Sequence, residues 1–337
     1  MKTILAILLF PCFAYGAADL QKADQLFSKR LYQEALTIYS AAAATAEKNI
    51  IPYGKLADAR GAAATAGESG LKALYRSAEC EALLARYGEA AQRLADAKLP
   101  PDRLWQGRLL LLRAETGRQF LRQYGYSLPA DEQKGVKDVT KLTSAQWRRL
   151  IEADYDSLWD LRGELLKHRL EGQGYFVDLE GAELAYTPTL WDFAVLRWTE
   201  YLLHDSEVSA ALPPADRLAE PAYRADYSAS APAALKAAAI YEDAAGMSSA
   251  SADGGSLHTA RDFAREYWRL QRLLIPFEHS NRVAAFDRAK LRARALLTLN
   301  DWAASFKTSL ARGWSFYRAA AMQREAPDYK AAVELCK

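Results

Sequence analysis

The stretch that most constrains the fold is YTPTLWDFAVLRWTEYLL, from Tyr186 to Leu203. Thr187 can cap a helix with its hydroxyl, Pro188 suits the first helical position, where its missing N–H costs nothing, and Asp192 would lie near the positive end of the helix dipole. Apolar residues occupy one stripe and both of its flanks, which a surface helix would leave polar: Leu190, Ala194, Trp198 and Tyr201 on the stripe, and Trp191, Phe193, Val195 and Leu202 beside it. The sequence therefore predicts a central buried helix with neighbours on several sides.

The amino-acid composition favours helices throughout the chain. Half of the 337 residues are hydrophobic, and 18 Tyr and 8 Trp stand against only 18 Gly and 12 Pro, a balance typical of close-packed helices. We therefore expect an all-α protein, an irregular array of antiparallel helical hairpins with no substantial sheet. Because 44 Lys and Arg nearly balance 42 Asp and Glu, the net charge of +2 predicts no broad attraction to nucleic acid or anionic lipid.

Residues 1–16 have the pattern of a signal peptide. Lys2 precedes a short apolar core, and residues 14–16 (AYG) form a small-x-small cleavage site. Bulky residues and a proline before Cys12 do not fit a lipobox, which disfavours a lipoprotein form. No later segment is apolar over the ~20 residues that a membrane span needs. The sequence therefore predicts an exported protein, periplasmic or extracellular, without a membrane span.

A Tyr-x-x-Ala pattern recurs at Tyr32–Ala35, Tyr87–Ala90 and Tyr329–Ala332. It resembles the tetratricopeptide repeat, in which a tyrosine begins the second helix of a hairpin and an alanine three residues on lets the first helix approach closely. A short side chain is physically sensible there, because two antiparallel helices meet at that point. The first two patterns lie 55 residues apart instead of the ~34 of consecutive repeats, so we expect a degenerate or intervening helix pair around 55–86.

The order of helical segments and breaks predicts two helical regions. Residues 17–205 would form a helical-repeat region that contains the Tyr186–Leu203 helix, 206–232 an Ala/Ser/Pro-rich loop, and 233–337 a second helical region. Because Lys337 follows Tyr329 by only about two turns, the last helix would lack a completed partner, and we expect the chain to stop within a unit of a longer protein. Single helices are predicted at 104–124, from Thr143 or Ser144 to about 172, and at 232–245, 257–274, 280–299 and 302–321, with 127–142 as a surface connection.

Helical phase also divides side chains between core and solvent. After Thr143, a broad apolar stripe comprises Trp147, Leu150, Ile151, Leu158, Leu161 and Leu165. Solvated faces are predicted for the arginines of helix 104–124 and for the acid pairs, namely Arg108, Arg113, Arg118 and Arg122, Asp154 with Asp156, and Glu180 with Glu183. Cys80 and Cys336 match no metal-ligand spacing, and we expect Cys80 to be an unpaired buried thiol, with a disulfide as the alternative in an exported protein.

The sequence contains no constellation of catalytic or metal-ligating residues. Segment 67–70 (GESG) is not a nucleophile elbow and is expected in an inter-helix turn. Segment 172–174 (GQG) lacks the third glycine of a dinucleotide loop, and no phosphate-binding Walker sequence occurs. No two histidines stand at i, i+4 as metal ligands, their positions being His168, His204, His258 and His279. We therefore predict no catalytic, cofactor-binding or metal-binding residue and no enzyme activity.

Trp147–Leu170 together with Pro188–Phe193 (PTLWDF), Arg197 and Tyr201 resembles the N-terminal helical region of bacterial alpha-2-macroglobulin family proteins. In that family a helix opens with Pro-Thr-Leu-Tyr-Asp-Phe followed by an arginine, and Trp191 stands here for the tyrosine. The resemblance implies an exported protein whose later domains form β-sandwiches, a protease-sensitive bait region and, in some members, a Cys-x-Glu-Gln thioester. None of these is in this sequence, so the resemblance assigns no inhibitory residue here.

One functional hypothesis and two alternatives result. The chain is expected to be a non-catalytic exported scaffold or protein-binding module, the N-terminal part of an envelope protease-trapping protein of the alpha-2-macroglobulin type. Its partners would be proteases or envelope proteins. A free-standing periplasmic tetratricopeptide-like adaptor is the first alternative. The second, an all-α envelope hydrolase or lyase, would need acids or histidines clustered around one cavity.

Overall fold

The all-α prediction is confirmed in the computed structural model, which describes residues 17–48, 62–132, 135–179, 184, 186–205, 233–248, 263–272, 275, 285–305 and 309–324. The regular elements in these ranges are helices, and the β pairing among them is one isolated antiparallel bridge between Arg169 and Thr189. Among the helices described, none combines the length and hydropathy of a membrane span. The predicted signal peptide and the predicted loop 206–232 lie outside the described residues.

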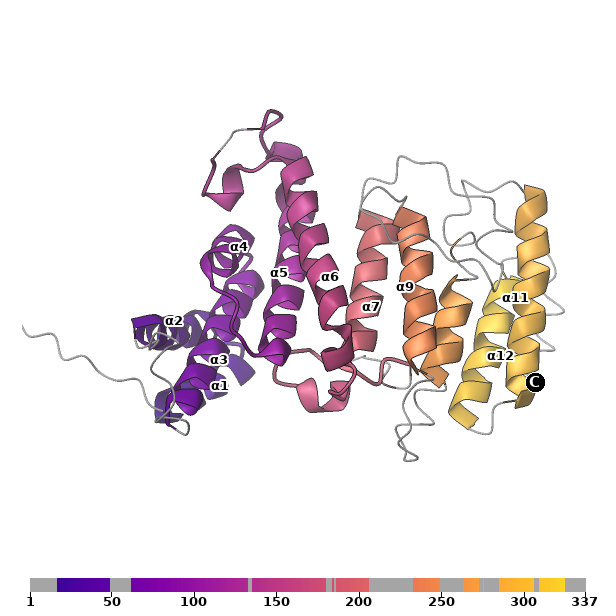
Figure 1. Ribbon diagram of the computed structural model, residues 1–337, viewed down its shortest axis with the longest axis horizontal. Helices are drawn as coiled ribbons and strands as arrows, with labels where there is room; N and C mark the ends of the chain where they lie inside the picture. Colours follow the sequence, from indigo (N-terminus) through magenta and orange to yellow (C-terminus); the bar gives the residue numbers. More distant parts are fainter. Residues whose placement is uncertain are drawn as a thin grey trace, which may run out of the picture. The chain divides into compact units, whose positions relative to one another are not determined.

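The chain divides into two compact units, residues 1–161 and 162–337, and the division falls within a helix. The helices of the first unit are α1 (Ala17–Ser28), α2 (Tyr32–Lys48), α3 (Ala62–Leu83), α4 (Tyr87–Asp96), α5 (Arg103–Tyr124) and most of α6 (Ser144–Leu165) (Figure 1). Each helix from α1 to α5 packs against the next, and α3 also contacts α1 and α5. Contacts between neighbours in sequence therefore build much of this unit.

The hairpins α1–α2 and α3–α4 are closed by turns of the same conformation. Arg30 and Ala85 have φ angles of 62° and 60°, the left-handed region in which many helices end. In each turn the next residue donates its N–H to the carbonyl five positions back, over 3.0 and 2.8 Å. The following helices begin at Tyr32 and Tyr87, as predicted.

Small buried residues stand where the helices of each hairpin meet. Ala35 in α2 and Ala90 in α4 are both fully buried. Tyr39 is also fully buried, and its hydroxyl donates to Asp24 on α1. Residues 62–83 form the single 22-residue helix α3, so the expected intervening helix pair is not found in the described part of 55–86. The third pattern, at 329–332, lies outside the described residues.

Helix α6 begins as predicted and buries most of its predicted stripe. The Thr143 hydroxyl accepts from the Gln146 N–H at 3.2 Å, and the Gln146 side chain accepts from the Thr143 N–H at 2.9 Å, a reciprocal cap. Leu150 is 44% exposed, contrary to the prediction, because it lies beside the i, i+4 row of the buried residues. Those buried residues are Trp147, Ile151, Leu158, Leu161 and Leu165.

The connection between α5 and α6 is anchored in the core, although the sequence predicted a surface segment. Val139 is buried against Phe120 and Trp147, whose ring centroids lie 4.7 Å apart. The Val139 N–H also donates to the Gln92 side chain on α4 at 2.8 Å. The buried Val139 side chain and its hydrogen bond to Gln92 therefore anchor the middle of the polar α5–α6 connection.

Replacing two glycines of α5 and α6 by alanine should change the stability of the protein in opposite directions. A Cβ at Gly163 would meet nothing within 4 Å, so Gly163→Ala should stabilise α6 by about 0.5 kcal/mol through its helix propensity. A Cβ at Gly117 would lie 3.0 Å from Ile151 and 3.3 Å from the Trp147 ring. Gly117→Ala should therefore be at least about 1 kcal/mol less favourable than Gly163→Ala in urea denaturation, and equal shifts for the two variants would contradict this packing.

The second unit is organised around the predicted central helix. Its elements are the 3₁₀ helix η4 (Leu170–Gln173), α7 (Leu190–Glu200) continued by a π-helical turn η5 (Tyr201–Asp205), α9 (Ala233–Ser248), helical residues 263–272, α11 (Ala285–Ser305) and α12 (Ser309–Arg324). Both α7 and η5 pack on α9, while α11 and α12 pair with each other. Helix α11 continues through residues 300 and 301, where the sequence predicted a break.

Candidate functional site

Helix α7 begins two residues later than predicted, and its cap is Thr189 rather than Thr187. The Thr189 hydroxyl accepts from the Asp192 N–H at 3.2 Å. The Asp192 carboxylate in turn accepts from the Thr189 N–H at 3.1 Å and from its hydroxyl at 2.6 Å. Pro188 therefore precedes the helix, and its carbonyl accepts from the Leu170 N–H at 3.0 Å.

Asp192 also joins α7 to a helix far away in the sequence. Its second carboxylate oxygen accepts from the indole N–H of Trp268 at 3.0 Å. Asp192 is 1% exposed and Trp268 is fully buried, so this hydrogen bond lies in the core of the second unit. A buried carboxylate needs several donors to offset its lost hydration, and here the helix cap and Trp268 supply them.

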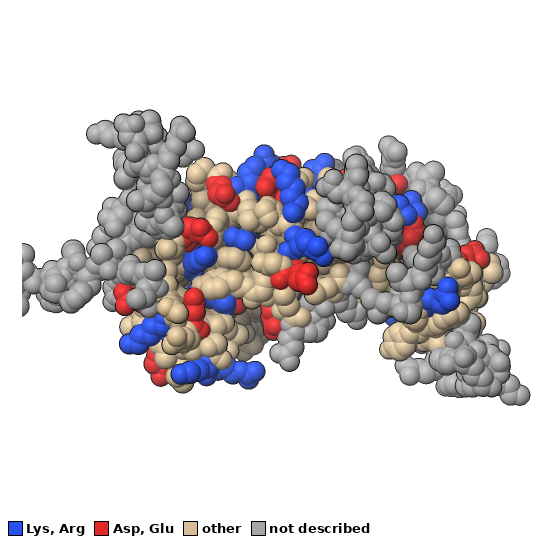
Figure 2. Space-filling view, turned by 90° about the horizontal axis from the view of Figure 1, so that it is seen from below, with Lys and Arg blue, Asp and Glu red and all other residues tan. Residues whose placement is uncertain are grey.

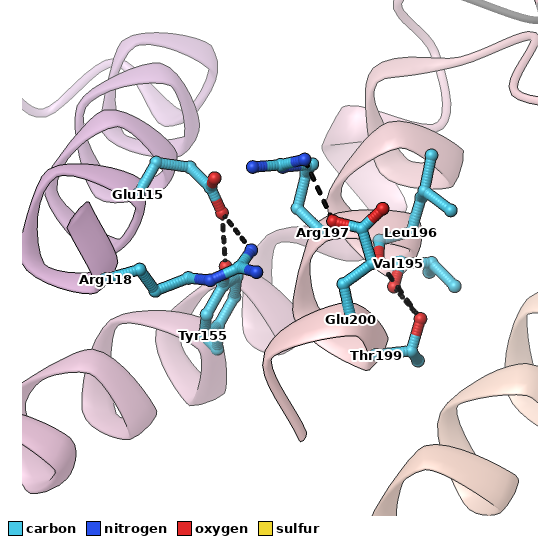
Figure 3. Close-up of polar contacts among 8 residues, drawn as sticks. All are labelled: Glu115, Arg118, Tyr155, Val195, Leu196, Arg197, Thr199 and Glu200. Carbon is cyan, nitrogen blue, oxygen red and sulfur yellow. Dashed lines mark hydrogen bonds and ion pairs between the residues drawn. The ribbon is translucent and has the colours of Figure 1, made fainter. Parts of the chain in front are cut away.

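The burial predicted for the central helix is confirmed. Its stripe and Trp191, Val195 and Leu202 are all at most 1% exposed, and Phe193 is half-buried. The Thr199 hydroxyl donates to the Val195 carbonyl at 2.8 Å (Figure 3), so this polar side chain is satisfied within the helix. The helix is therefore a packing hub.

Four aromatic rings gather at the start of the central stretch. Tyr186 stacks on Tyr267 with ring centroids 4.0 Å apart. Trp314 of α12 approaches Tyr267 edge-on at 5.4 Å and Phe263 at 5.8 Å. Tyr186 and Trp314 are half-buried, whereas Phe263 and Tyr267 are buried. That these four residues meet was not predicted from the sequence.

Arg118 of α5 is buried, although the sequence predicted a solvated arginine face. Its side chain is 1% exposed and pairs with Glu115 at 2.8 Å. Glu115 also accepts from the Tyr155 hydroxyl of α6 at 2.6 Å (Figure 3). Burial, and then the charge of Glu115, holds the pKa of Tyr155 well above its usual value, so the phenol remains a donor. Arg122 is exposed, as predicted.

An ion pair between Arg113 and Asp154 also connects α5 to α6. Arg113 Nε donates to Asp154 at 2.8 Å, and Asp154 is 5% exposed, contrary to the predicted solvated acid pair. Burial raises the pKa of Asp154 above its usual value, and Arg113 offsets part of this rise. Similarly, Arg93 of α4 donates to the buried Glu81 of α3 at 2.9 Å. These carboxylates bind arginine donors and hold neighbouring helices together. The acids Glu180 and Glu183 lie outside the described residues.

The two glycine-containing segments that were considered for catalysis and ligand binding lie in or at the end of helices. Segment 67–70 lies within α3 and not in the expected turn, and segment 172–174 lies at the end of η4. His168 contacts Glu164 one helical turn before it, at 3.2 Å. Within the described ranges, no three His, Cys, Asp or Glu side chains are grouped as a metal site. Figure 2 shows basic and acidic side chains interspersed among the described residues of one face.

Cys80 lies in α3 as the unpaired buried thiol that the sequence predicted, while Cys336 lies outside the described residues. Burial raises the pKa of Cys80 to about 12. Because the thiolate is the reactive form, Cys80 in a Cys12→Ser, Cys336→Ser background should react with iodoacetamide at pH 8 at least about 100-fold more slowly in the native chain than in urea. Equal rates in the two conditions would contradict its burial.

The comparisons with protein families, with curated proteins and with solved structures find no match for this chain.

Proposed function

We propose that the chain is a non-catalytic protein-binding scaffold, exported to the cell envelope, and the N-terminal helical region of an alpha-2-macroglobulin-like protease-trapping protein. The observation that carries the binding role is the pair of equivalent hairpins in the first unit. Arg30 and Ala85 share one left-handed turn, and Tyr32 and Tyr87 begin the second helices. Stacked hairpins of this kind present extended surfaces for partners.

The side-chain chemistry supports a scaffold. The buried acids Glu81 and Asp154 bind arginines of adjacent helices, and Asp192 binds a helix cap and Trp268. Carboxylates that are bound in this way hold the helices in position. Their oxygens accept hydrogen bonds from groups of the protein itself, which supports a structural role over a role in binding a substrate. The PTLWDF segment, which carries the resemblance to the alpha-2-macroglobulin family, contains Asp192 and supplies a packing hub.

Reading the gene past the codon for Lys337 tests the family assignment. An in-frame extension that encodes β-rich domains is the expected result. A stop codon directly after Lys337 would contradict it and would favour the free-standing adaptor.

The mature N-terminus tests export. Mass spectrometry of the protein from the cell envelope should find Ala17 as the first residue, and deletion of residues 2–16 should leave the protein in the cytoplasm. A chain that retains Met1 and stays in the cytoplasm would overturn the proposed location.

A further inference from the structure

Three exposed apolar side chains mark one end of the helices in the first unit. Leu31 closes the α1–α2 turn, Leu83 ends α3, and Tyr126 follows α5. Their exposed fractions are 42%, 50% and 90%. Leu31 directly precedes α2, Leu83 is the last residue of α3 and Tyr126 lies two residues after α5, so each side chain is at the end of a helix. We call these three residues and the turns that carry them the turn edge.

Two contacts show that the turns of this edge are neighbours. The guanidinium of Arg86, in the α3–α4 turn, donates to the side chain of Gln33 at the start of α2 over 2.7 Å. The Tyr124 hydroxyl, at the end of α5, lies 3.5 Å from the carbonyl oxygen of Ala85. The three apolar tips therefore belong to one continuous edge.

Basic side chains accompany the apolar tips. Lys29, Arg30 and Arg86 are exposed, and none of them forms an ion pair with a described residue. The nearby exposed acids, Glu34 and Glu89, are set back in the first turns of α2 and α4. The turn residues 29–31, 84–86 and 125–127 contain these three cations and no acid, which gives the turns a local positive charge although the whole chain is nearly neutral.

The shape of the edge favours a lipid surface over a protein partner. A stable protein interface needs about 800 Å² from each partner, and three separate tips on turns do not form such a face. A bilayer interface can deform around single side chains, takes up leucine and tyrosine at headgroup depth, and attracts adjacent lysines and arginines to lipid phosphates.

We propose that the turn edge docks the first unit on an anionic lipid surface. Leu31, Leu83 and Tyr126 insert at the level of the headgroups, while Lys29, Arg30 and Arg86 face the phosphates. This peripheral contact needs no membrane span. It is independent of the family assignment above, because it rests on the turn edge alone.

Vesicle sedimentation tests the proposal. The purified chain should sediment with phosphatidylcholine vesicles that contain about one-third phosphatidylglycerol, and less with pure phosphatidylcholine. The Leu31→Ser, Leu83→Ser, Tyr126→Ser variant should partition to the anionic vesicles at least about tenfold less. Replacing Lys29, Arg30 and Arg86 by glutamine should remove the preference for phosphatidylglycerol.

Leu99→Ser is the matched control, because this leucine is 42% exposed in the same unit but lies between α4 and α5, at the opposite end of α4 from the turn edge. This variant should bind like the native chain, and circular dichroism should show that all variants are folded. The proposal is overturned if the native chain stays in solution, or if the control loses as much binding as the turn-edge variant. Self-association without vesicles that the turn-edge variant abolishes would assign the edge to a protein contact and would also overturn it.

Discussion

Replacing Trp198 by alanine should lower the free energy of unfolding by about 3 to 5 kcal/mol, the range found when a large buried aromatic is truncated. Trp198 is 1% exposed, and its stripe neighbours Ala194 and Tyr201 are equally buried. The loss combines the transfer of the indole ring with the cavity left between α7 and its neighbours. Urea denaturation, followed by circular dichroism at 222 nm, measures it.

Tyr317→Ala is the matched control for this experiment, because Tyr317 lies on α12 of the same unit and is 71% exposed. An aromatic ring that is mostly in water should cost less than about 0.5 kcal/mol on removal. A loss below about 1 kcal/mol for Trp198→Ala would show that α7 is not the hub of the second unit.

The sequence predicted helix starts, caps and buried faces best where the spacing of a few neighbouring residues determines them. The tyrosines at 32 and 87 begin helices, the Thr143 cap is in place, and the stripe of α7 is buried. Each of these depends on spacing within a few residues. The buried alanines at 35 and 90 follow from the same spacing, since only a small side chain fits where two helices meet.

The start of α7 was misplaced because two capping signals compete there. Thr187 followed by Pro188 matches one rule, but Thr189 followed three residues later by Asp192 forms a capping box, which satisfies two backbone donors instead of one. The bridge between Arg169 and Thr189 also holds the chain extended before the helix. The contact of Asp192 with Trp268, 76 residues further on, has no signal in local sequence.

The buried ion pairs were missed for a different reason. Arg118 follows Leu111 and Ala114 on the apolar row of α5, and Asp154 lies between Ile151 and Leu158 on the buried row of α6. Helical phase therefore placed both charges in the core. Both residues were nevertheless predicted to face solvent, because charged side chains are usually exposed. A charged side chain can be buried when it has a partner of opposite charge.

Arg118→Met should consequently cost about 3 kcal/mol, because the largely buried Glu115 carboxylate loses the Arg118 guanidinium that pairs with it. Methionine keeps most of the apolar stem of the arginine, so the loss reports the charge more than the volume. The side chain of Glu115 is 19% exposed, and residual hydration places the expected cost at the lower end of the range for broken buried pairs. Arg122→Met, one turn further along α5 and exposed, should change stability by less than about 0.5 kcal/mol.

A double replacement separates the charge from the packing. In Glu115→Gln with Arg118→Met the carboxylate that has lost Arg118 is also replaced, and the amide oxygen can still accept from the Tyr155 hydroxyl, which lies 2.6 Å from Glu115 in the native chain. The double variant should therefore be at least about 1 kcal/mol more stable than Arg118→Met alone in urea denaturation. If Arg118→Met matched Arg122→Met, or if the double variant were the less stable of the two, the Glu115–Arg118 pair would not be a buried contact between charges.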